Sequence, residues 1–229
     1  MNRHDPWQLV LCSGAEHLRD QLVRKGFDVY TSDFNYDNSR MFANGDVYTA
    51  LPEAPSLAGK RVCVIQSLTS SGELDRFKFS TQDRIVELLQ MVQILQEPTT
   101  VSYENGERQY VVTDPPAEVV VLCTHMAFSK QDQIYRTGEV NASKRFLELL
   151  YQCGVSRVAA IDPHVPLDFP WIQELIQQER FIPLSMYKAF VDRLRSQGEN
   201  SDISFVSTPG KRRTPLGVER GMKRSCWIN

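Results

Sequence analysis

Residues 119–164 limit most strongly what this chain can fold into. The stretch begins with VVVLC, continues through a polar loop from Thr124 to Gly138 and an amphipathic segment over 139–153, and ends in a second apolar run, RVAAI. Short β-branched runs separated by a helical pattern are typical of two buried parallel strands joined by a helix. Each run leads into a polar cluster, the second into Asp162-Pro163-His164. Because α/β sheets bind ligands where their strands end, the stretch predicts both a fold class and the place of a site.

The chain before this stretch shows the same alternation of strand and helix patterns. Apolar runs at 7–12, 27–31 and 60–67 predict strands, and residues 15–26 and 81–97 predict helices. The second helix is the clearest, since five apolar side chains share one of its faces: Ile85, Leu88, Leu89, Val92 and Leu95. The alternation predicts an α/β fold with a mostly parallel sheet that carries helices on both faces.

The pattern is looser after His164. One or two helices are expected there, with an apolar stripe formed by Met186, Phe190 and Leu194. The run ISFVS at 203–207 predicts the first strand of a further unit, and a basic tail rich in Gly and Pro follows it. We therefore expect residues 1–165 to form one α/β domain, and residues 166–229 to form an incomplete second α/β unit.

Composition excludes several classes of protein. Of 229 residues, 41% are hydrophobic and 24% are charged, as in an ordinary globular protein, and the net charge of -2 argues against a general nucleic-acid binder. No apolar run is long enough to span a membrane, and the N-terminus lacks the apolar stretch of a signal peptide. The five cysteines are widely spaced without a CxxC pair, which favours reduced thiols in a cytoplasmic protein.

Two Asn-Gly pairs indicate turns. Asn105-Gly106 lies between two extended runs and predicts a β-hairpin within residues 97–117. The segment from Phe42 through Asn44 and Gly45 to Asp46 predicts a second turn, in which an aromatic ring, an amide and a carboxylate could stack on and hydrogen-bond a purine base. An ordinary hairpin turn is the alternative, and the residues alone favour it.

The loop that follows VVVLC carries Lys130, Gln131 and Asp132. A lysine there could hold phosphate groups, and the amide and carboxylate could bind the polar edge of a base. Loops are commonly polar for other reasons, so composition leaves a binding loop and an ordinary loop equally open.

Two further clusters could hold anions or metal. Asp162 and His164 follow a buried strand and could bind a magnesium ion directly or through water, although a histidine there is more often structural. The run Lys211-Arg212-Arg213 could contact a phosphate, although a basic run near a terminus is more often a solvated tail. The sequence has no GxxxxGK[ST] loop, GxSxG elbow or HExxH helix.

Taken in order, these segments resemble the ribose-phosphate pyrophosphokinase (phosphoribosyl pyrophosphate synthetase) family over most of residues 8–165. LVLCSGAEHLRDQLV is similar to the family's opening strand, Ser-Gly turn and helix, and MFANGDVYTAL is similar to its adenine loop. RVCVIQS and VELLQMVQIL resemble its second core strand and Glu-Leu-Leu helix. The block from MAFSKQDQ to AAIDPH resembles its nucleotide-binding loop, helix and Asp-Leu-His segment. The resemblance implies a phosphoribosyltransferase-like (Rossmann-like) fold.

The resemblance also implies roles for particular residues. Contacts with ATP would come from Phe42, Asn44, Gly45, Asp46, Lys130, Gln131 and Asp132. His164, with support from Asp162, would help to hold the Mg²⁺ of Mg-ATP. Lys211 and Arg213 would match the family's catalytic Lys-Arg-Arg segment.

In the family's reaction, a diphosphoryl group passes from ATP to ribose 5-phosphate, which gives phosphoribosyl pyrophosphate and AMP for nucleotide biosynthesis. Such chemistry depends on in-line positioning, magnesium and cationic side chains. The resemblance further implies homo-oligomers, or hetero-oligomers with homologous subunits, that are built through the adenine loop. Neither nucleic acid nor a membrane is an expected partner.

The chain departs from the family pattern at several positions. Lys130 replaces an arginine, Asp46 replaces a glutamate, and Pro163 replaces a leucine. Residues 97–117 look like an insertion, the basic run at 211–213 comes early after the preceding strand, and the acidic loop that grips ribose 5-phosphate is not found.

Three interpretations therefore remain open. The chain is a divergent synthetase, a non-catalytic regulatory homologue that binds nucleotide or assembles with active subunits, or a truncated product that folds only in part.

Overall fold

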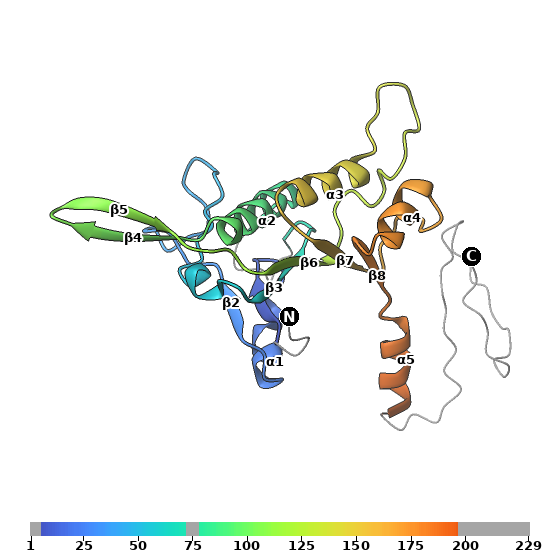
Figure 1. The fold of residues 1–229 in the computed structure, drawn as a ribbon. Helices are drawn as coiled ribbons and strands as arrows, with labels where there is room; N and C mark the ends of the chain where they lie inside the picture. The colour runs from blue at the N-terminus through green and yellow to red at the C-terminus, as the bar shows by residue number, and fades with distance from the viewer. Residues whose placement is uncertain (1–5, 72–77, 197–229) are drawn as a thin grey trace, which may run out of the picture. The chain divides into compact units, whose positions relative to one another are not determined.

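The computed structural model describes residues 6–71 and 78–196, and the chain divides into two compact units, Met1–Ser185 and Met186–Asn229. The first unit contains all the strands of the described residues (Figure 1). In the second unit the described part is one helix, α5 (Tyr187–Ser196). The predicted strand at 203–207 lies outside the described residues.

Six strands form an entirely parallel sheet in the first unit. In the order in which they lie side by side, they are β2 (Val29–Thr31), β1 (Gln8–Leu11), β3 (Arg61–Ser67), β6 (Glu118–His125), β7 (Arg157–Ile161) and β8 (Phe181–Leu184). Each neighbouring pair is parallel, so the prediction of a mostly parallel α/β sheet is confirmed. From β1 the chain first adds β2 on one side of it, and it then returns to add β3 and the later strands on the other side. The carboxyl ends of β1 and β3 therefore flank the topological switch point of the sheet.

Helices cover the two faces of this sheet unequally. The larger core lies under α2 (Thr81–Gln96), α3 (Ala142–Gln152), α4 (Pro170–Gln177) and the short η2 (Ala54–Leu57). On the other face, η1 (Glu16–Leu18) and α1 (Arg19–Arg24) pack through Leu18 and Leu22 on β1 and β3. Figure 1 shows α2 and α3 on one side of the strands and α1 on the other. Helices on both faces were predicted, and the structure confirms them.

Local signals explain where the two long helices begin and end. The hydroxyl of Ser80 accepts a hydrogen bond from the backbone of Asp83, and the Asp83 side chain accepts one from the backbone of Ser80, which makes a capping box at the start of α2. Asn141 caps α3 by accepting a hydrogen bond from the Lys144 N–H at 2.9 Å. Gly154 follows α3 with a φ of 96°, the left-handed conformation in which glycine commonly ends a helix.

The face of α2 that is buried differs from the predicted one. Its buried residues are Arg84, Glu87, Leu88, Met91, Val92 and Leu95. Ile85 and Leu89, which were expected in the core, are only partly buried. The helix is therefore rotated so that two charged residues, and not only apolar ones, face the sheet.

Strand β8 was not predicted, and it extends the first unit beyond the expected boundary at residue 165. Its short sequence contains Pro183, which has no N–H and is usually confined to sheet edges. Here β8 is an edge strand, and Pro183 lies beside Ala160 of β7. Phe181 is buried in the main core, so β8 belongs with the sheet, and the first unit runs to Ser185.

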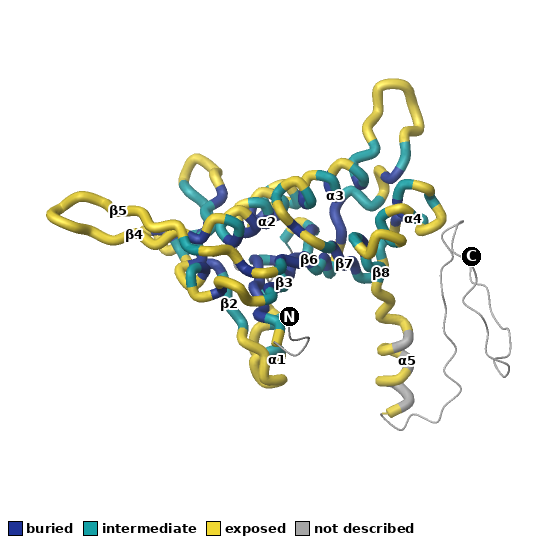
Figure 2. The backbone as a smooth tube through the Cα atoms, viewed as in Figure 1, coloured by how far each residue is buried: buried dark blue, intermediate teal, exposed yellow. Residues whose placement is uncertain are grey.

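The predicted hairpin around Asn105-Gly106 is confirmed. Strands β4 (Thr99–Glu104) and β5 (Glu107–Val112) form a separate two-stranded antiparallel sheet. All residues of both strands are exposed, and Figure 2 shows the hairpin as exposed along its whole length.

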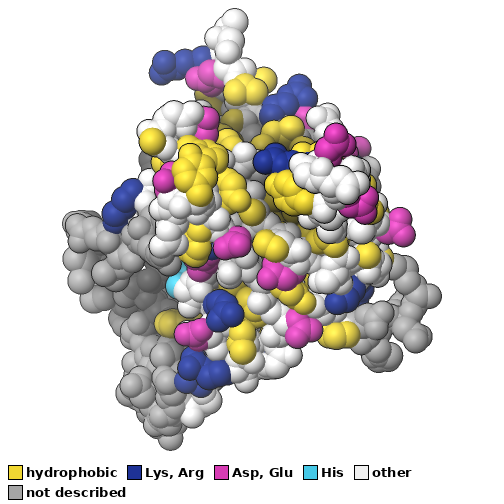
Figure 3. All heavy atoms as spheres, turned by 90° about the vertical axis from the view of Figure 1, so that its left-hand side faces the viewer, with side chains coloured by type: hydrophobic (Ala, Val, Ile, Leu, Met, Phe, Trp, Pro, Cys, Tyr) yellow, Lys and Arg dark blue, Asp and Glu magenta, His cyan; other side chains and the backbone are white. Residues whose placement is uncertain are grey.

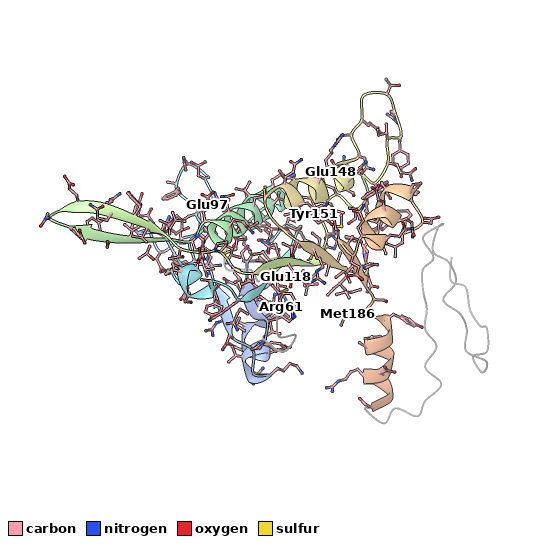
Figure 4. All side chains as sticks on the ribbon, in the orientation of Figure 1. Arg61, Glu97, Glu118, Glu148, Tyr151 and Met186 are labelled. Atoms are coloured by element: carbon pink, nitrogen blue, oxygen red, sulfur yellow. The ribbon has the colours of Figure 1, made fainter. Side chains whose placement is uncertain are left out.

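The amino edge of the sheet is held by a charged cluster. Glu118 lies beside Arg61 and accepts a hydrogen bond from its guanidinium at 3.0 Å, and it also pairs with Arg157. The Arg61 guanidinium stacks 3.9 Å from the ring centre of Trp7. Figure 4 shows Arg61 and Glu118 on adjacent strands. The side chains of Arg61 and Glu118 at this edge are therefore engaged with each other.

The cysteines were predicted to be reduced thiols. Cys12, Cys63, Cys123 and Cys153 are free, and Cys226 lies outside the described residues. Burial raises the pKa of Cys63 and of Cys123 to about 12, so both are thiols at neutral pH.

Within residues 6–71 and 78–196, none of the helices combines the length and apolar character that a membrane span requires.

Candidate functional site

The two polar strand ends predicted from the sequence lie next to each other. Strands β6 and β7 are parallel neighbours, with Cys123 beside Ala160 near their carboxyl ends. The loop of residues 126–141 therefore starts beside the segment 162–164 at the same edge of the sheet. This arrangement is the usual position of ligand sites in open α/β sheets.

The start of the 126–141 loop is fixed against the first turn of α3. Phe128 has a φ of 57°, a left-handed conformation that is unfavourable for a bulky residue. Its carbonyl accepts hydrogen bonds from the Ser143 hydroxyl at 2.5 Å and from the Gln131 N–H at 2.7 Å. The Ser143 N–H in turn donates to the Gln131 carbonyl at 3.2 Å. Residues held in strained conformations by their surroundings are concentrated at binding sites.

Within this loop, the three predicted nucleotide-binding residues have different surroundings. Lys130 and Gln131 are exposed, whereas Asp132 is buried. The Asp132 carboxylate accepts a hydrogen bond from the Tyr135 hydroxyl at 3.2 Å, and its carbonyl accepts one from the Asn141 amide at 2.7 Å. Lys130 and Gln131 are thus presented to solvent, and Asp132 fixes the loop that presents them.

Asp162 and His164 are both exposed beyond the end of β7. Asp162 has a φ of 42°, and its N–H donates to the Leu184 carbonyl of β8 at 2.7 Å. Among residues 6–71 and 78–196, no three His, Cys, Asp or Glu side chains come together as a metal site. An exposed carboxylate such as Asp162 fits a Mg²⁺ ion that takes most of its ligands from water and substrate phosphates, and the His164 imidazole would fit as a contact to the water of such an ion.

The predicted turn at Phe42 is an ordered hairpin turn. The Phe42 N–H donates to the Asp46 carbonyl at 2.8 Å, and Gly45 has a φ of 92°. The Asn44 amide donates to the Asp46 carboxylate at 2.6 Å. The centre of the half-buried Phe42 ring lies 5.6 Å from that of Tyr48 in an edge-to-face arrangement and 6.1 Å from that of Tyr36.

The structure does not bring this turn to the 126–141 loop. Among the described residues, the turn at 42–46 and residues 130–132 share no hydrogen bond, ion pair or ring contact. Figure 1 shows the two loops well apart in the first unit. Lys211 and Arg213, the predicted catalytic residues, lie outside the described residues.

A buried polar network at the switch point was not predicted. The Glu87 carboxylate accepts hydrogen bonds from the Ser13 hydroxyl at 2.5 Å, the Ser13 N–H at 2.9 Å and the Gln66 amide at 2.8 Å. The Gln66 carbonyl oxygen accepts a hydrogen bond from the Gly14 N–H at 2.9 Å. Burial, partly offset by these hydrogen bonds, raises the pKa of Glu87. The network ties the end of β1 to β3 and α2.

Arg84 extends this network to the chain that leaves β3. It donates to the Ser67 carbonyl at 3.1 Å and to the Ser71 hydroxyl at 3.1 Å. The sequence did contain a signal, because Arg84 and Glu87 are three residues apart and lie four residues before Leu88 and Met91 respectively, on one helix face. Charged residues within a buried helical stripe indicate a buried polar contact.

A cavity of about 500 Å³ lies beyond the ends of β1 and β2, and it too was not predicted. Glu16, Asp33 and Arg40 are among the residues that line it. Arg40 is almost fully buried, pairs with Glu16, donates to the Ser32 carbonyl, and lies 5.0 Å from the ring centre of Phe34. Because the cation is already paired within the chain, Arg40 holds the 32–40 segment against η1.

Comparison with known proteins supports the fold and nothing finer. The sequence matches no family model and no curated protein sequence. The structure is similar to the crystal structure of phosphoribosylpyrophosphate synthetase from Mycobacterium smegmatis, with a TM-score of 0.58 and 17% sequence identity. The similarity covers 86% of this chain and 54% of that synthetase, so the chain spans about half of its length. At this identity the likeness establishes that the chain has the same kind of α/β fold as part of that synthetase.

Proposed function

We propose that the chain binds Mg-ATP at the carboxyl ends of β6 and β7 and acts as a ribose-phosphate diphosphokinase. In this reaction the terminal diphosphoryl group of ATP passes to ribose 5-phosphate, which gives phosphoribosyl pyrophosphate and AMP. One observation carries the proposal. Two neighbouring parallel strands lead into segments that are held in strained backbone conformations at Phe128 and Asp162, and these segments carry Lys130, Asp162 and His164 at one edge of the sheet.

The exposed side chains at this edge suit a polyphosphate ligand. Lys130 extends from a loop that Asp132, Ser143 and Asn141 hold in place, so its ammonium can meet a phosphate with little loss of loop entropy. Asp162 and His164 would hold Mg²⁺ from the adjacent strand. When bound, the ion would neutralise the charge of the phosphates.

The turn at 42–46 supports an oligomeric site. Because this turn and the 130–132 loop share no contact within one chain, we propose that Phe42 and Asn44 bind the adenine of a nucleotide held by another subunit. The half-buried Phe42 ring is held between the rings of Tyr48 and Tyr36, and in the proposed site it would stack on the base.

The test combines ATP titration calorimetry with an assay of AMP release from ATP, Mg²⁺ and ribose 5-phosphate. Lys130→Ala is expected to weaken ATP binding about ten-fold, the effect of losing one charge-assisted contact. Lys60→Ala removes an equally exposed lysine beside the amino edge of the sheet and should leave affinity unchanged. His164→Ala should weaken ATP binding in the presence of Mg²⁺ and leave binding in EDTA unchanged.

The two assays separate the proposed enzyme from the alternative. ATP binding without AMP release would favour a non-catalytic regulatory homologue that binds nucleotide and assembles with active subunits. One feature favours this alternative: Lys130 offers a point charge where an arginine would offer a planar fork for phosphate. A folded chain that binds no ATP would overturn both functions.

A further inference from the structure

Tyr135 is an exposed aromatic residue that is held in place on the loop of residues 126–141. The residue is 60% exposed. Its hydroxyl donates a hydrogen bond to the carboxylate of the buried Asp132 at 3.2 Å. A hydrogen bond to an ionised carboxylate is stronger than one between neutral groups. The ring is therefore fixed at its hydroxyl end, while much of its surface stays accessible.

The backbone of Tyr135 is fixed as well. One oxygen of the Glu139 carboxylate accepts hydrogen bonds from the N–H of Tyr135 at 2.8 Å and from the N–H of Arg136 at 3.0 Å. The Glu139 N–H in turn donates to the Arg136 carbonyl at 3.1 Å. Separate partners thus hold the side chain and the backbone, so the ring loses little conformational entropy when a ligand packs on it.

Exposure alone does not distinguish Tyr135 from other tyrosines. Tyr103 and Tyr110 of the β4–β5 hairpin are 66% and 63% exposed, and Figure 3 shows hydrophobic side chains among charged ones at the surface on the left-hand side of Figure 1. Tyr135 differs because its hydroxyl is bound to a buried carboxylate. Among residues 6–71 and 78–196, no aromatic ring or guanidinium stacks on it. A planar ligand would therefore displace no ring or cation from Tyr135.

The hydrogen bond to Asp132 also places Tyr135 near the proposed phosphate contact. Because the hydroxyl reaches Asp132, the ring lies against the part of the loop that directly follows Lys130 and Gln131. Phe128, the other aromatic residue of this loop, packs against the main core. Tyr135 is therefore the aromatic side chain that the loop presents to a ligand.

We propose that Tyr135 stacks on the base of the nucleotide whose phosphates Lys130 holds. The assignment rests on the proposed function, in which ATP binds at this edge of the sheet, and it gives the base a contact on the chain that holds the phosphates. Aromatic rings and nucleobases attract each other in offset stacking. A base has two faces, so Tyr135 of this chain and Phe42 of another subunit would each take one of them.

The ligand class that fits this contact is a nucleoside triphosphate. Every nucleobase has a π face, so stacking on Tyr135 does not select one base over another. The contact should strengthen the binding of ATP and of GTP by similar factors. It should contribute nothing to the binding of inorganic tripolyphosphate, which offers phosphates to Lys130 without a base.

Titration calorimetry of the full chain with ATP, GTP and tripolyphosphate, each with Mg²⁺, tests the stacking. Tyr135→Leu removes the aromatic face. It should raise the dissociation constants of ATP and GTP about ten-fold and leave that of tripolyphosphate unchanged. Tyr135→Phe loses the same hydrogen bond to Asp132 but keeps the ring, so it should weaken ATP binding less than Tyr135→Leu does. Tyr103→Leu removes a similarly exposed tyrosine from the separate two-stranded sheet and should change none of the three constants.

Three results would overturn the stacking contact and leave the proposed function standing. The first is ATP affinity that falls in Lys130→Ala but not in Tyr135→Leu, because the base would then bind elsewhere. The second is an equal loss of ATP and tripolyphosphate affinity in Tyr135→Leu, and the third is an equal loss of ATP affinity in Tyr135→Phe and Tyr135→Leu. In both of these cases the tyrosine would only shape the loop. A wild-type chain that binds none of the three ligands would overturn the proposed function and the stacking contact together.

Discussion

Replacing Gly14 with alanine should destabilise the first unit by forcing apart the network at the switch point. A Cβ atom at Gly14 would lie 2.6 Å from the side-chain oxygen Oε1 of Gln66, 2.6 Å from the backbone oxygen of Ser67 and 2.8 Å from a guanidinium nitrogen of Arg84. The Ser67 oxygen belongs to the backbone of β3 and cannot move away alone. Overpacking costs roughly 1–3 kcal/mol. Loss of the Gly14 to Gln66 hydrogen bond adds about 1 kcal/mol, so we expect about 2–4 kcal/mol in total.

Urea unfolding followed by circular dichroism measures this cost as a shift in midpoint at constant slope. Gly26→Ala is the matched control, because Gly26 has a φ of 87° with no atom within 4 Å of the added Cβ. In that variant only the left-handed backbone conformation lowers the free energy of unfolding, by about 1 kcal/mol. A Gly14→Ala cost no larger than that of Gly26→Ala would refute the close packing at the switch point.

The double variant Gly14→Ala/Gln66→Ala gives a second check. Truncation of Gln66 removes one of the clashing atoms but leaves the Ser67 carbonyl in place. Stability should therefore recover in part at most, relative to the sum of the two single variants.

Three further changes test other contacts. Burial raises the pKa of Glu87, so protonated Glu87 favours the folded state. This contribution to stability is complete below the ordinary carboxyl pKa and is lost as the pH rises through the raised pKa. Glu87→Gln should remove that part of the pH dependence in urea titrations at several pH values. Ser80→Ala removes the cap of α2 and should lower the free energy of unfolding by about 1 kcal/mol in urea titrations. Asn141→Ala removes the cap of α3 and the bond to the Asp132 carbonyl, so calorimetry should show weaker ATP binding, and the free energy of unfolding should fall by about 1 kcal/mol as for Ser80→Ala.

Local patterns were sufficient to predict most of the fold. The β-branched runs before Thr124 and Asp162 became buried neighbouring strands, and Asn105-Gly106 became a hairpin turn. Strand β8 was missed because Pro183 argues against a strand, and only the exposed edge of the sheet makes it acceptable.

The site was predicted less completely because burial depends on tertiary packing. Lys130 and Asp132 look equivalent in sequence, yet one is exposed, and the other is buried against Tyr135. The spacing of Arg84 and Glu87 indicates that they are buried, but their partners, Ser13 and the end of β3, lie in other segments of the chain. Periodicity predicts the helix face on which a charged residue lies. It does not predict the hydrogen-bond partner, because that partner comes from a distant segment of the chain.

Hydrogen–deuterium exchange with and without Mg-ATP tests most directly the central claim that nucleotide binds at the carboxyl ends of β6 and β7. The account predicts slower exchange in peptides covering residues 126–141 and 162–168 when Mg-ATP is added. We expect no change along β4 and β5, which form a separate sheet. If a nucleotide is shared between two subunits, exchange should also slow at residues 42–46. Protection that is absent from both carboxyl-end segments, while ATP is bound, would contradict the account.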